Sequence, residues 1–204
     1  SDGLAGLDAV PYTGAGVKVA VVDTGFKNHS DLSPLLRVSL VGRKADDENG
    51  HGNHVATIVG GTGKSSSGMY RGVAPDAQVI TVRVLDEVGQ GLSSDVIAGI
   101  DDIIRMNQDF WHIKVVNMSL GHPVHEPAEL DPLVRAVEAL WDSGVVVVCS
   151  AGNAGRDGYG TITSPGNSRK VITVGSVTTW GDSHASNAIV STFSSRGPTR
   201  GEVW

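Results

Sequence analysis

The sequence predicts an α/β fold of three layers, in which helices cover both faces of a central, mostly parallel sheet. Several short runs of β-branched residues have the near-continuous apolar character of strands that are covered on both faces. Segments with the apolar periodicity of helices lie between these runs, and strands that alternate with helices form parallel sheets with right-handed crossovers. The chain has 204 residues, of which 40% are hydrophobic, and this is enough for one substantial core.

Five runs are predicted to be strands, and each ends abruptly in polar or glycine-containing residues. They are 17–22, 78–85, 115–118, 145–148 and 171–177. An open α/β sheet binds its ligands at the carboxyl ends of its strands. The residues directly after these runs are therefore the first candidates for a functional site.

Two segments carry clear helix signals. Residues 93–95 offer an N-cap to an apolar stripe over 96–104. Asp131 is predicted to cap a second helix, with Pro132 at its first position and Gly144 at its C-terminal stop.

Composition excludes several classes of protein. The net charge of −6 gives no electrostatic reason to expect a nucleic acid or an anionic membrane as partner. No apolar run approaches the ~20 residues that a membrane helix needs. The lone Cys149 cannot build a disulfide framework, and its place after an apolar strand predicts a buried, inert thiol.

Candidate catalytic side chains lie where predicted strands end and where a helix begins. Asp23 places a carboxylate after the strand 17–22, although an Asp at this point could also cap the following turn. His51 stands beside a glycine at the start of a short apolar helical pattern, which leaves room for the imidazole. Asn153 brings an amide donor shortly after the strand 145–148. Taken singly, each of these signals is weak.

Together, the motifs resemble the subtilisin family of serine proteases, in the order in which that family carries them and over nearly the whole chain. The motifs are Asp23-Thr24-Gly25, His51-Gly52-Asn53-His54-Val55-Ala56, Gly72-Val73-Ala74-Pro75, Asn117-Met118-Ser119-Leu120-Gly121, Ala151-Gly152-Asn153, Ser164-Pro165-Gly166 and Phe193-Ser194-Ser195-Arg196-Gly197-Pro198. Asn53 stands where the family pattern has Thr. The resemblance implies a subtilisin-like version of the three-layer fold.

The resemblance also implies a role for each catalytic side chain. His51 would be the general base and acid, Asp23 would hold its tautomer and stabilise the imidazolium, and Asn153 would donate to the oxyanion. Two extended segments would pair with the main chain of a polypeptide substrate. The substrate-binding residues implied are Gly89, Gln90 and Gly91 in one segment, Ser119, Leu120 and Gly121 in the other, and Ala151 and Gly152 beside a side-chain pocket.

The family's nucleophile motif, Gly-Thr-Ser-Met-Ala, is absent from the 204 residues. Ser194 and Ser195 belong to the loop that precedes this motif in the family, and neither is expected to replace it. We therefore expect residues 1–204 to form a single, partial peptidase domain that ends at Trp204, about twenty residues before the nucleophile, and that is inactive alone. The C-terminal remainder of the domain, or a propeptide, is then an expected partner.

Some expectations concern surroundings and ligands. The chain begins at Ser1 without a signal peptide, so we expect a processed or cut chain, secreted or extracellular by resemblance. No cofactor is expected to be required. Residues 46–48 are interpreted as a solvated loop, with a structural calcium contact as the alternative. His54 is expected to pack against the sheet.

Three other functions compete with a protease. The first is a non-catalytic, subtilisin-like fragment or pseudoprotease that binds peptides. The second is a nucleotide hydrolase, but the phosphate-loop pattern over 60–65 fails because Ile58 stands where that motif demands Gly. The third is a zinc site at His51 with His54, or at His122 with His125 and Glu126, and neither set fits the His-Glu-x-x-His pattern.

Overall fold

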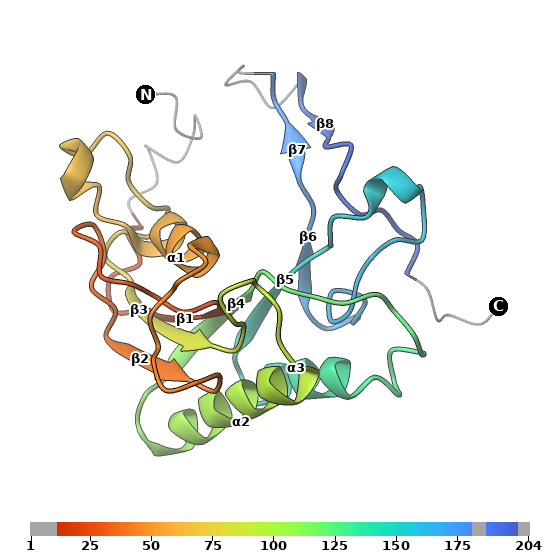
Figure 1. Cartoon of the computed structure of the whole chain (residues 1–204), viewed down its shortest axis with the longest axis horizontal. Coiled ribbons are helices and arrows are strands. Elements are labelled where there is room, and N and C mark those ends of the chain that lie inside the picture. The colour runs from red at the N-terminus through yellow and green to blue at the C-terminus, as the bar shows by residue number, and fades with distance from the viewer. Residues whose placement is uncertain (1–11, 181–186, 200–204) are drawn as a thin grey trace. The chain divides into compact units, whose positions relative to one another are not determined.

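The computed structural model in Figure 1 describes residues 12–180 and 187–199. Its elements are β1 (Lys18–Asp23), β2 (Leu36–Ser39), α1 (His51–Gly60), the 3₁₀ helix η1 (Lys64–Ser66), β3 (Gln78–Arg83), α2 (Ser93–Asp109), β4 (Ile113–Met118), α3 (Pro132–Asp142), β5 (Val146–Ser150), the 3₁₀ helix η2 (Gly155–Asp157), β6 (Ile172–Val174), β7 (Val177–Thr178) and β8 (Ile189–Val190). The chain divides into two compact units, residues 1–117 and 118–204, and each is described by itself. That residues 1–204 form one partial domain stays a prediction, and Ser1 and Trp204 lie outside the described residues.

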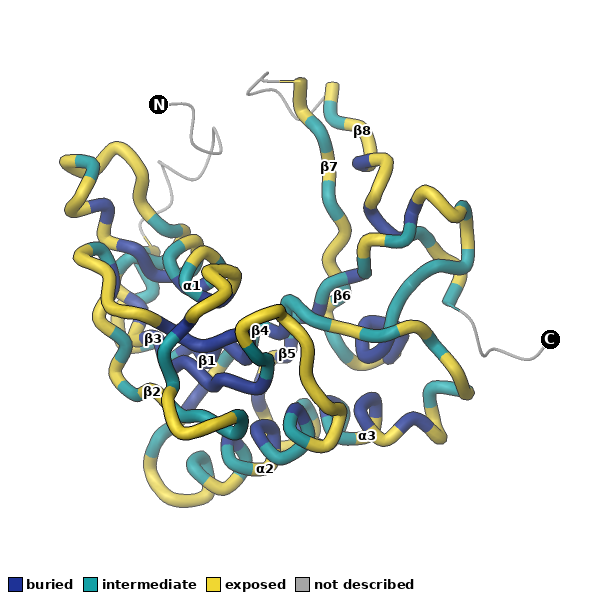
Figure 2. Tube along the Cα trace, in the orientation of Figure 1, coloured by how far each residue is buried: buried dark blue, intermediate teal, exposed yellow. Residues whose placement is uncertain are grey.

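The first unit contains a sheet in the order β2-β3-β1-β4. β1 and β2 both run parallel to β3, and the register pairs Asp23 with Arg83 at the carboxyl ends of β1 and β3. Five of the six residues in each of β1 and β3 are buried. Figure 2 shows these strands mostly in the dark blue of buried residues. The near-continuous apolar runs are therefore explained by cover on both faces.

Helices α1 and α2 supply that cover, one on each face of these strands (Figure 1). Val79 on β3 packs in a cluster with Ala56 of α1, whereas a Cβ on Gly99 of α2 would lie 3.3 Å from Val82 Cγ1. Residues 79 and 82 point to opposite faces because side chains alternate along a strand. The α/β class with a mostly parallel sheet is confirmed, while the missing C-terminal part stays a prediction.

In the second unit, β5 pairs in parallel with β6, and β7 pairs with β8 antiparallel. The signals for α3 are confirmed: the Asp131 side chain accepts from the backbone N–H groups of Leu133 and Val134, and Pro132 opens the helix. Gly144 lies just after it with φ +92°, the left-handed conformation that glycine adopts at helix ends.

Several details differ from expectation. No side chain caps α2, because residues 93–95 already belong to the helix and Leu92 takes the capping position with its carbonyl alone. The run 171–177 contains β6 and the start of β7, which are separated by Gly175 and Ser176. His54 is exposed rather than packed against the sheet. β2 was not predicted, since it has only four residues and includes Arg37 and Ser39.

Asp47 is the single residue whose burial differs most from the sequence-based prediction. It is buried, so the interpretation of 46–48 as a solvated loop is wrong at this position.

Within the described residues, no helix is long and apolar enough to cross a membrane.

Candidate active site

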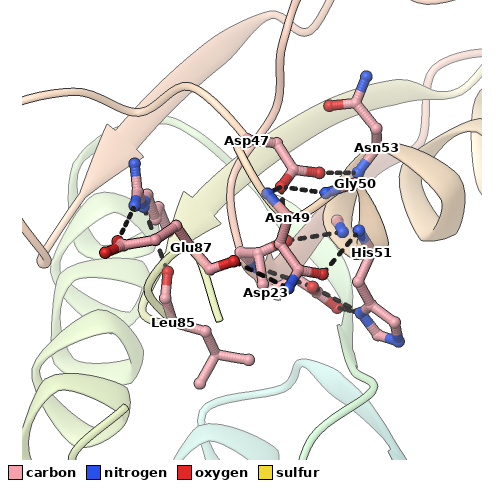
Figure 3. Close-up of polar contacts among 11 residues, drawn as sticks. Asp23, Asp47, Asn49, Gly50, His51, Asn53, Leu85 and Glu87 are labelled. Atoms are coloured by element: carbon pink, nitrogen blue, oxygen red, sulfur yellow. Dashed lines mark hydrogen bonds and ion pairs between the residues drawn. The ribbon is translucent and has the colours of Figure 1, made fainter. Parts of the chain in front are cut away.

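The carboxylate of Asp23 and the imidazole of His51 meet in the first unit. Asp23 is the last residue of β1, and His51 is the first residue of α1. The Nδ1 atom of His51 lies 2.7 Å from Asp23 Oδ1 and 2.9 Å from Oδ2 (Figure 3). Residues 28 positions apart in sequence are thus joined at the carboxyl edge of the parallel strands.

The geometry selects one tautomer of the imidazole. An ionised carboxylate can only accept hydrogen bonds, so in the neutral imidazole Nδ1 carries the ring proton and Nε2 keeps its lone pair. The Asp23 side chain is 1% exposed, whereas that of His51 is 48% exposed. The pair therefore combines a buried acceptor with an accessible ring, which is the arrangement a general base needs to take a proton from a hydroxyl.

Two glycines allow this close meeting of strand and helix. A Cβ on Gly52 would lie 2.4 Å from the carbonyl oxygen of Gly25, and a Cβ on Gly25 would lie 2.7 Å from that of Ala45. Gly25 also has φ +109°, which other residues rarely adopt. The glycines after Asp23 and after His51 are therefore needed by the backbone itself.

The predicted substrate segment at Gly89, Gln90 and Gly91 is also in the first unit. Residues 86–90 form a hydrogen-bonded turn rather than an extended strand, with Asp86 N–H donating to the Gln90 carbonyl over 2.7 Å. The Asp86 carboxylate accepts from the backbone N–H groups of Val88 and Gln90. Gly91 packs on the end of β3, since a Cβ there would lie 2.4 Å from Val84 O.

The second predicted segment, Ser119, Leu120 and Gly121, follows β4 and lies in the second unit. The Leu120 carbonyl accepts from Ser150 Oγ over 3.2 Å. A Cβ on Gly121 would lie 2.6 Å from the carbonyl of Ser164, whose backbone bridges to His122. Side chain and backbone bonds thus fix this segment to β5 and to the loop around residue 164.

Asn153, Ala151 and Gly152 also belong to the second unit. Gly152 has φ +104°, and a Cβ there would lie 2.8 Å from Ser195 Oγ. Asn153 is exposed, and its side-chain amide makes no hydrogen bond within residues 12–180 and 187–199. The donor that the sequence predicts is therefore unengaged in the part of the chain that the structure describes.

Ser194 and Ser195 have structural hydrogen bonds. Both are buried, and their hydroxyl oxygens accept from the backbone N–H groups of Ser176 and Ala154, respectively. Neither hydroxyl is accessible to a substrate, in line with their exclusion as nucleophiles.

Burial also settles the character of Cys149. Its side chain is buried, and this burial raises the pKa of the thiol to about 12. The prediction of a buried core thiol is confirmed, and a raised pKa disfavours the reactive thiolate, so inertness stays the expectation.

Sequence reasoning missed a buried arginine near the site. The guanidinium of Arg83 donates to the carbonyls of Lys44, Asp46 and Leu85, and lies 3.8 Å from a carboxylate oxygen of Glu87. Arg83 thus fastens the segment that precedes α1 to the end of β3. Its only sequence signal is a cation inside the otherwise apolar run 78–85. Among the residues described, no group of three or more His, Cys, Asp or Glu side chains could hold a metal ion.

Comparison with known proteins places these features in a family. Residues 14–203 match the subtilase family. The serine protease AprX of Bacillus subtilis (strain 168) is 46% identical over 195 residues, which is 92% of this chain and 44% of AprX. The minor extracellular protease Vpr of the same organism is 35% identical over 180 residues, which is 80% of this chain and 21% of Vpr.

A solved structure gives the same match in three dimensions. The crystal structure of a cold-adapted subtilisin-like serine proteinase superposes with a TM-score of 0.73 at 34% identity, over 92% of this chain and 62% of that one. The chain thus spans less than half the length of AprX and about a fifth of Vpr.

Proposed function

Because the chain belongs to the subtilase family, we propose that it forms part of a serine endopeptidase that hydrolyses peptide bonds through an Asp-His-Ser triad. One observation carries the proposal: the 2.7 Å contact between the Nδ1 of the accessible His51 and the buried carboxylate of Asp23. A structural ion pair does not need an exposed imidazole. A general base does, because its free nitrogen must reach the reacting hydroxyl.

In the proposed mechanism, His51 Nε2 takes the proton of a serine hydroxyl as that oxygen attacks the substrate carbonyl. The same imidazole then gives the proton to the leaving amine. Asp23 stabilises the imidazolium between these steps, and the Asn153 amide donates to the oxyanion. The serine itself comes from a segment that the 204 residues do not contain, so we expect these residues to be inactive alone.

We propose polypeptides as the substrates. Main-chain groups of 89–91 and 119–121 would bind the extended substrate backbone, with a side-chain pocket near Ala151 and Gly152. Backbone recognition is tolerant of sequence, so we expect broad cleavage. The name of the relative Vpr describes that protein as extracellular, and we propose the same location here.

A further segment of protein is proposed to cover part of the second unit. The support is a set of apolar side chains on β6, β7 and β8 that are about half exposed: Ile172, Val174, Val177, Ile189 and Val190. The C-terminal remainder of the domain, or a propeptide, would remove this apolar surface from water.

The proposed chemistry needs no cofactor. Structural calcium would be revealed by a drop in the melting temperature of the protein when a chelator is added.

Labelling with a fluorophosphonate probe tests the proposed function. The whole protein that carries this chain should be labelled on a serine and should cleave a denatured polypeptide. The His51→Ala variant should lose both reactions, while His54→Ala, which changes an exposed histidine of the same helix, should keep both. A folded whole protein that binds peptide but is never labelled would instead be a pseudoprotease.

The pH dependence supplies a second test. Protonation of His51 removes the lone pair that accepts the hydroxyl proton, so turnover should fall as the pH is lowered. The limiting slope should be about tenfold per pH unit. Turnover that stays level through the acid range would contradict His51 as the base.

A further inference from the structure

We propose that Thr24 and Asp47 form a buried hydrogen-bond relay that fixes His51 against Asp23, which makes both of them positioning residues for the general base. The proposal rests on the proposed function of His51. It assigns a role to a residue that the sequence places in a run of solvated charges. We call these two side chains, with the backbone N–H groups that they bind, the Thr24–Asp47 relay.

The Asp47 carboxylate accepts hydrogen bonds from several backbone N–H groups just before and within the first turn of α1. Its side chain is almost fully buried, and Oδ1 accepts from Thr24 Oγ1 at 2.9 Å, from Asn49 N at 3.0 Å and from Gly50 N at 2.8 Å. Oδ2 accepts from Asn53 N at 2.8 Å. Figure 3 shows the carboxylate directed at Gly50 and Asn53, which flank His51 on both sides.

The Thr24 hydroxyl connects this carboxylate to the strand that carries Asp23. Its single proton is donated to Asp47, and its oxygen accepts from Gly52 N over 2.8 Å. The backbone N–H of Thr24 donates to Asp23 Oδ1 over 2.7 Å. One buried residue therefore holds both the carboxylate that orients the imidazole and the helix turn from which the imidazole projects.

The burial of the Asp47 carboxylate explains why it needs so many hydrogen-bond donors. A buried carboxylate is costly unless hydrogen bonds compensate it, and no ion pair within the described residues includes Asp47. The compensation comes instead from N–H groups at the start of α1, where the helix dipole also favours a negative charge. Gly50, at the capping position, has no side chain to do this. Asp47 takes over the capping, and the turn that it holds begins with His51.

A positioning role predicts a specific kinetic signature. Displacing the imidazole by a fraction of an ångström should slow the chemical step, while peptide binding by other segments is unchanged. Loss of the relay should therefore lower kcat roughly 10-fold to 100-fold and leave KM within about twofold. General destabilisation would instead lower the amount of folded enzyme and its melting temperature.

Threonine substitutions give a matched set of variants. Thr24→Val keeps the shape of the side chain but removes the hydroxyl, and Thr24→Ser keeps the hydroxyl. Thr81→Val is the control, because Thr81 is also 1% exposed and its hydroxyl has no hydrogen-bond partner. We expect Thr24→Val to lose kcat, Thr24→Ser to retain it within about threefold, and Thr81→Val to match the parent.

A spectroscopic measurement separates this proposal from the proposed function. The proton on His51 Nδ1 should give a downfield NMR resonance because it is shared with Asp23, whether or not the protein hydrolyses peptides. Thr24→Val should shift or broaden that resonance, and Thr81→Val should leave it unchanged. Asp47→Asn, which places an amide where one carboxylate oxygen accepts from Asn53, should act in the same direction if Thr24→Val fails to fold.

The outcomes are distinct. A parent protein that shows the resonance but no hydrolysis or labelling would overturn the proposed function and leave the relay to be judged by its resonance shift. A folded Thr24→Val variant with the parent's kcat and the parent's His51 resonance would overturn the relay.

Discussion

The first unit covers its strands on both faces, whereas the late strands of the second unit leave apolar side chains in water. β1 and β3 are buried along nearly their whole length, between α1 and α2. On β6, Ile172 and Val174 are about half exposed, and the β7–β8 pair is similar. The Asp23–His51 pair therefore lies at the end of strands that are covered on both faces. The second unit instead has strands whose apolar side chains could be buried further.

The largest expected effect is the loss of turnover when Asp23, at the end of the covered strand β1, loses its charge. Asp23→Asn keeps the size of the side chain but removes the charge that orients and stabilises the His51 ring. Turnover by the whole protein should fall about 10⁴-fold, the magnitude known for this change in a serine protease triad, with little change in peptide affinity. Steady-state kinetics on a peptide substrate measures it, and a loss below about tenfold would contradict the assignment of Asp23.

The next effect compares two phenylalanines, one in each unit. Phe26 is fully buried in the cluster that α1 covers, whereas Phe193 is 43% exposed. Phe26→Ala should lower the free energy of unfolding by about 3–5 kcal/mol, because it leaves a cavity, and Phe193→Ala should cost about 1 kcal/mol. Urea unfolding measures both, and equal losses would remove the contrast between the units.

A smaller effect concerns how the helices begin. Asp131 accepts two backbone N–H bonds at the start of α3, whereas Asp95 lies within the first turn of α2 and caps nothing. Asp131→Ala should cost about 1 kcal/mol of unfolding free energy. Asp95→Ala should cost only about 0.3 kcal/mol through the helix dipole. Thermal melts compare the two variants, and a reversed order would contradict the capping difference.

The smallest effect probes the exposed surface directly. Val174→Ser in the 204-residue chain should change the free energy of unfolding by less than about 0.5 kcal/mol, because the side chain is already half exposed. In the whole protein the same change should cost more, since the proposed covering segment buries Val174. An equal and small cost in both would argue against that segment.

The catalytic pair could be predicted from the sequence, whereas the residues that support it could not. Asp23 and His51 could be predicted because each stands at the boundary of a strongly patterned element, and their motifs match a family. Asp47 could not, because a run of acidic residues between two elements is the usual pattern of a solvated loop. Only the fold reveals that the start of α1 turns its N–H groups toward that carboxylate.

The fold shows the same division. β1, β3 and α3 could be predicted because their apolar patterns and capping residues agree. β2 could not, since its four residues include Arg37, whose guanidinium leaves the strand to bind the Phe26 carbonyl and the Asp46 carboxylate. The start of α2 was misplaced because a capping side chain and a first-turn side chain look alike in sequence.

The buried Cys149 can report how often the strands around it open. Burial raises the pKa of this thiol to about 12, so the folded chain keeps it in the unreactive, protonated form at neutral pH. Alkylating reagents should consume it only as fast as the surrounding strands come apart. Because residues 1–204 contain one cysteine, the alkylation rate of this chain in native buffer measures that opening with no engineered probe.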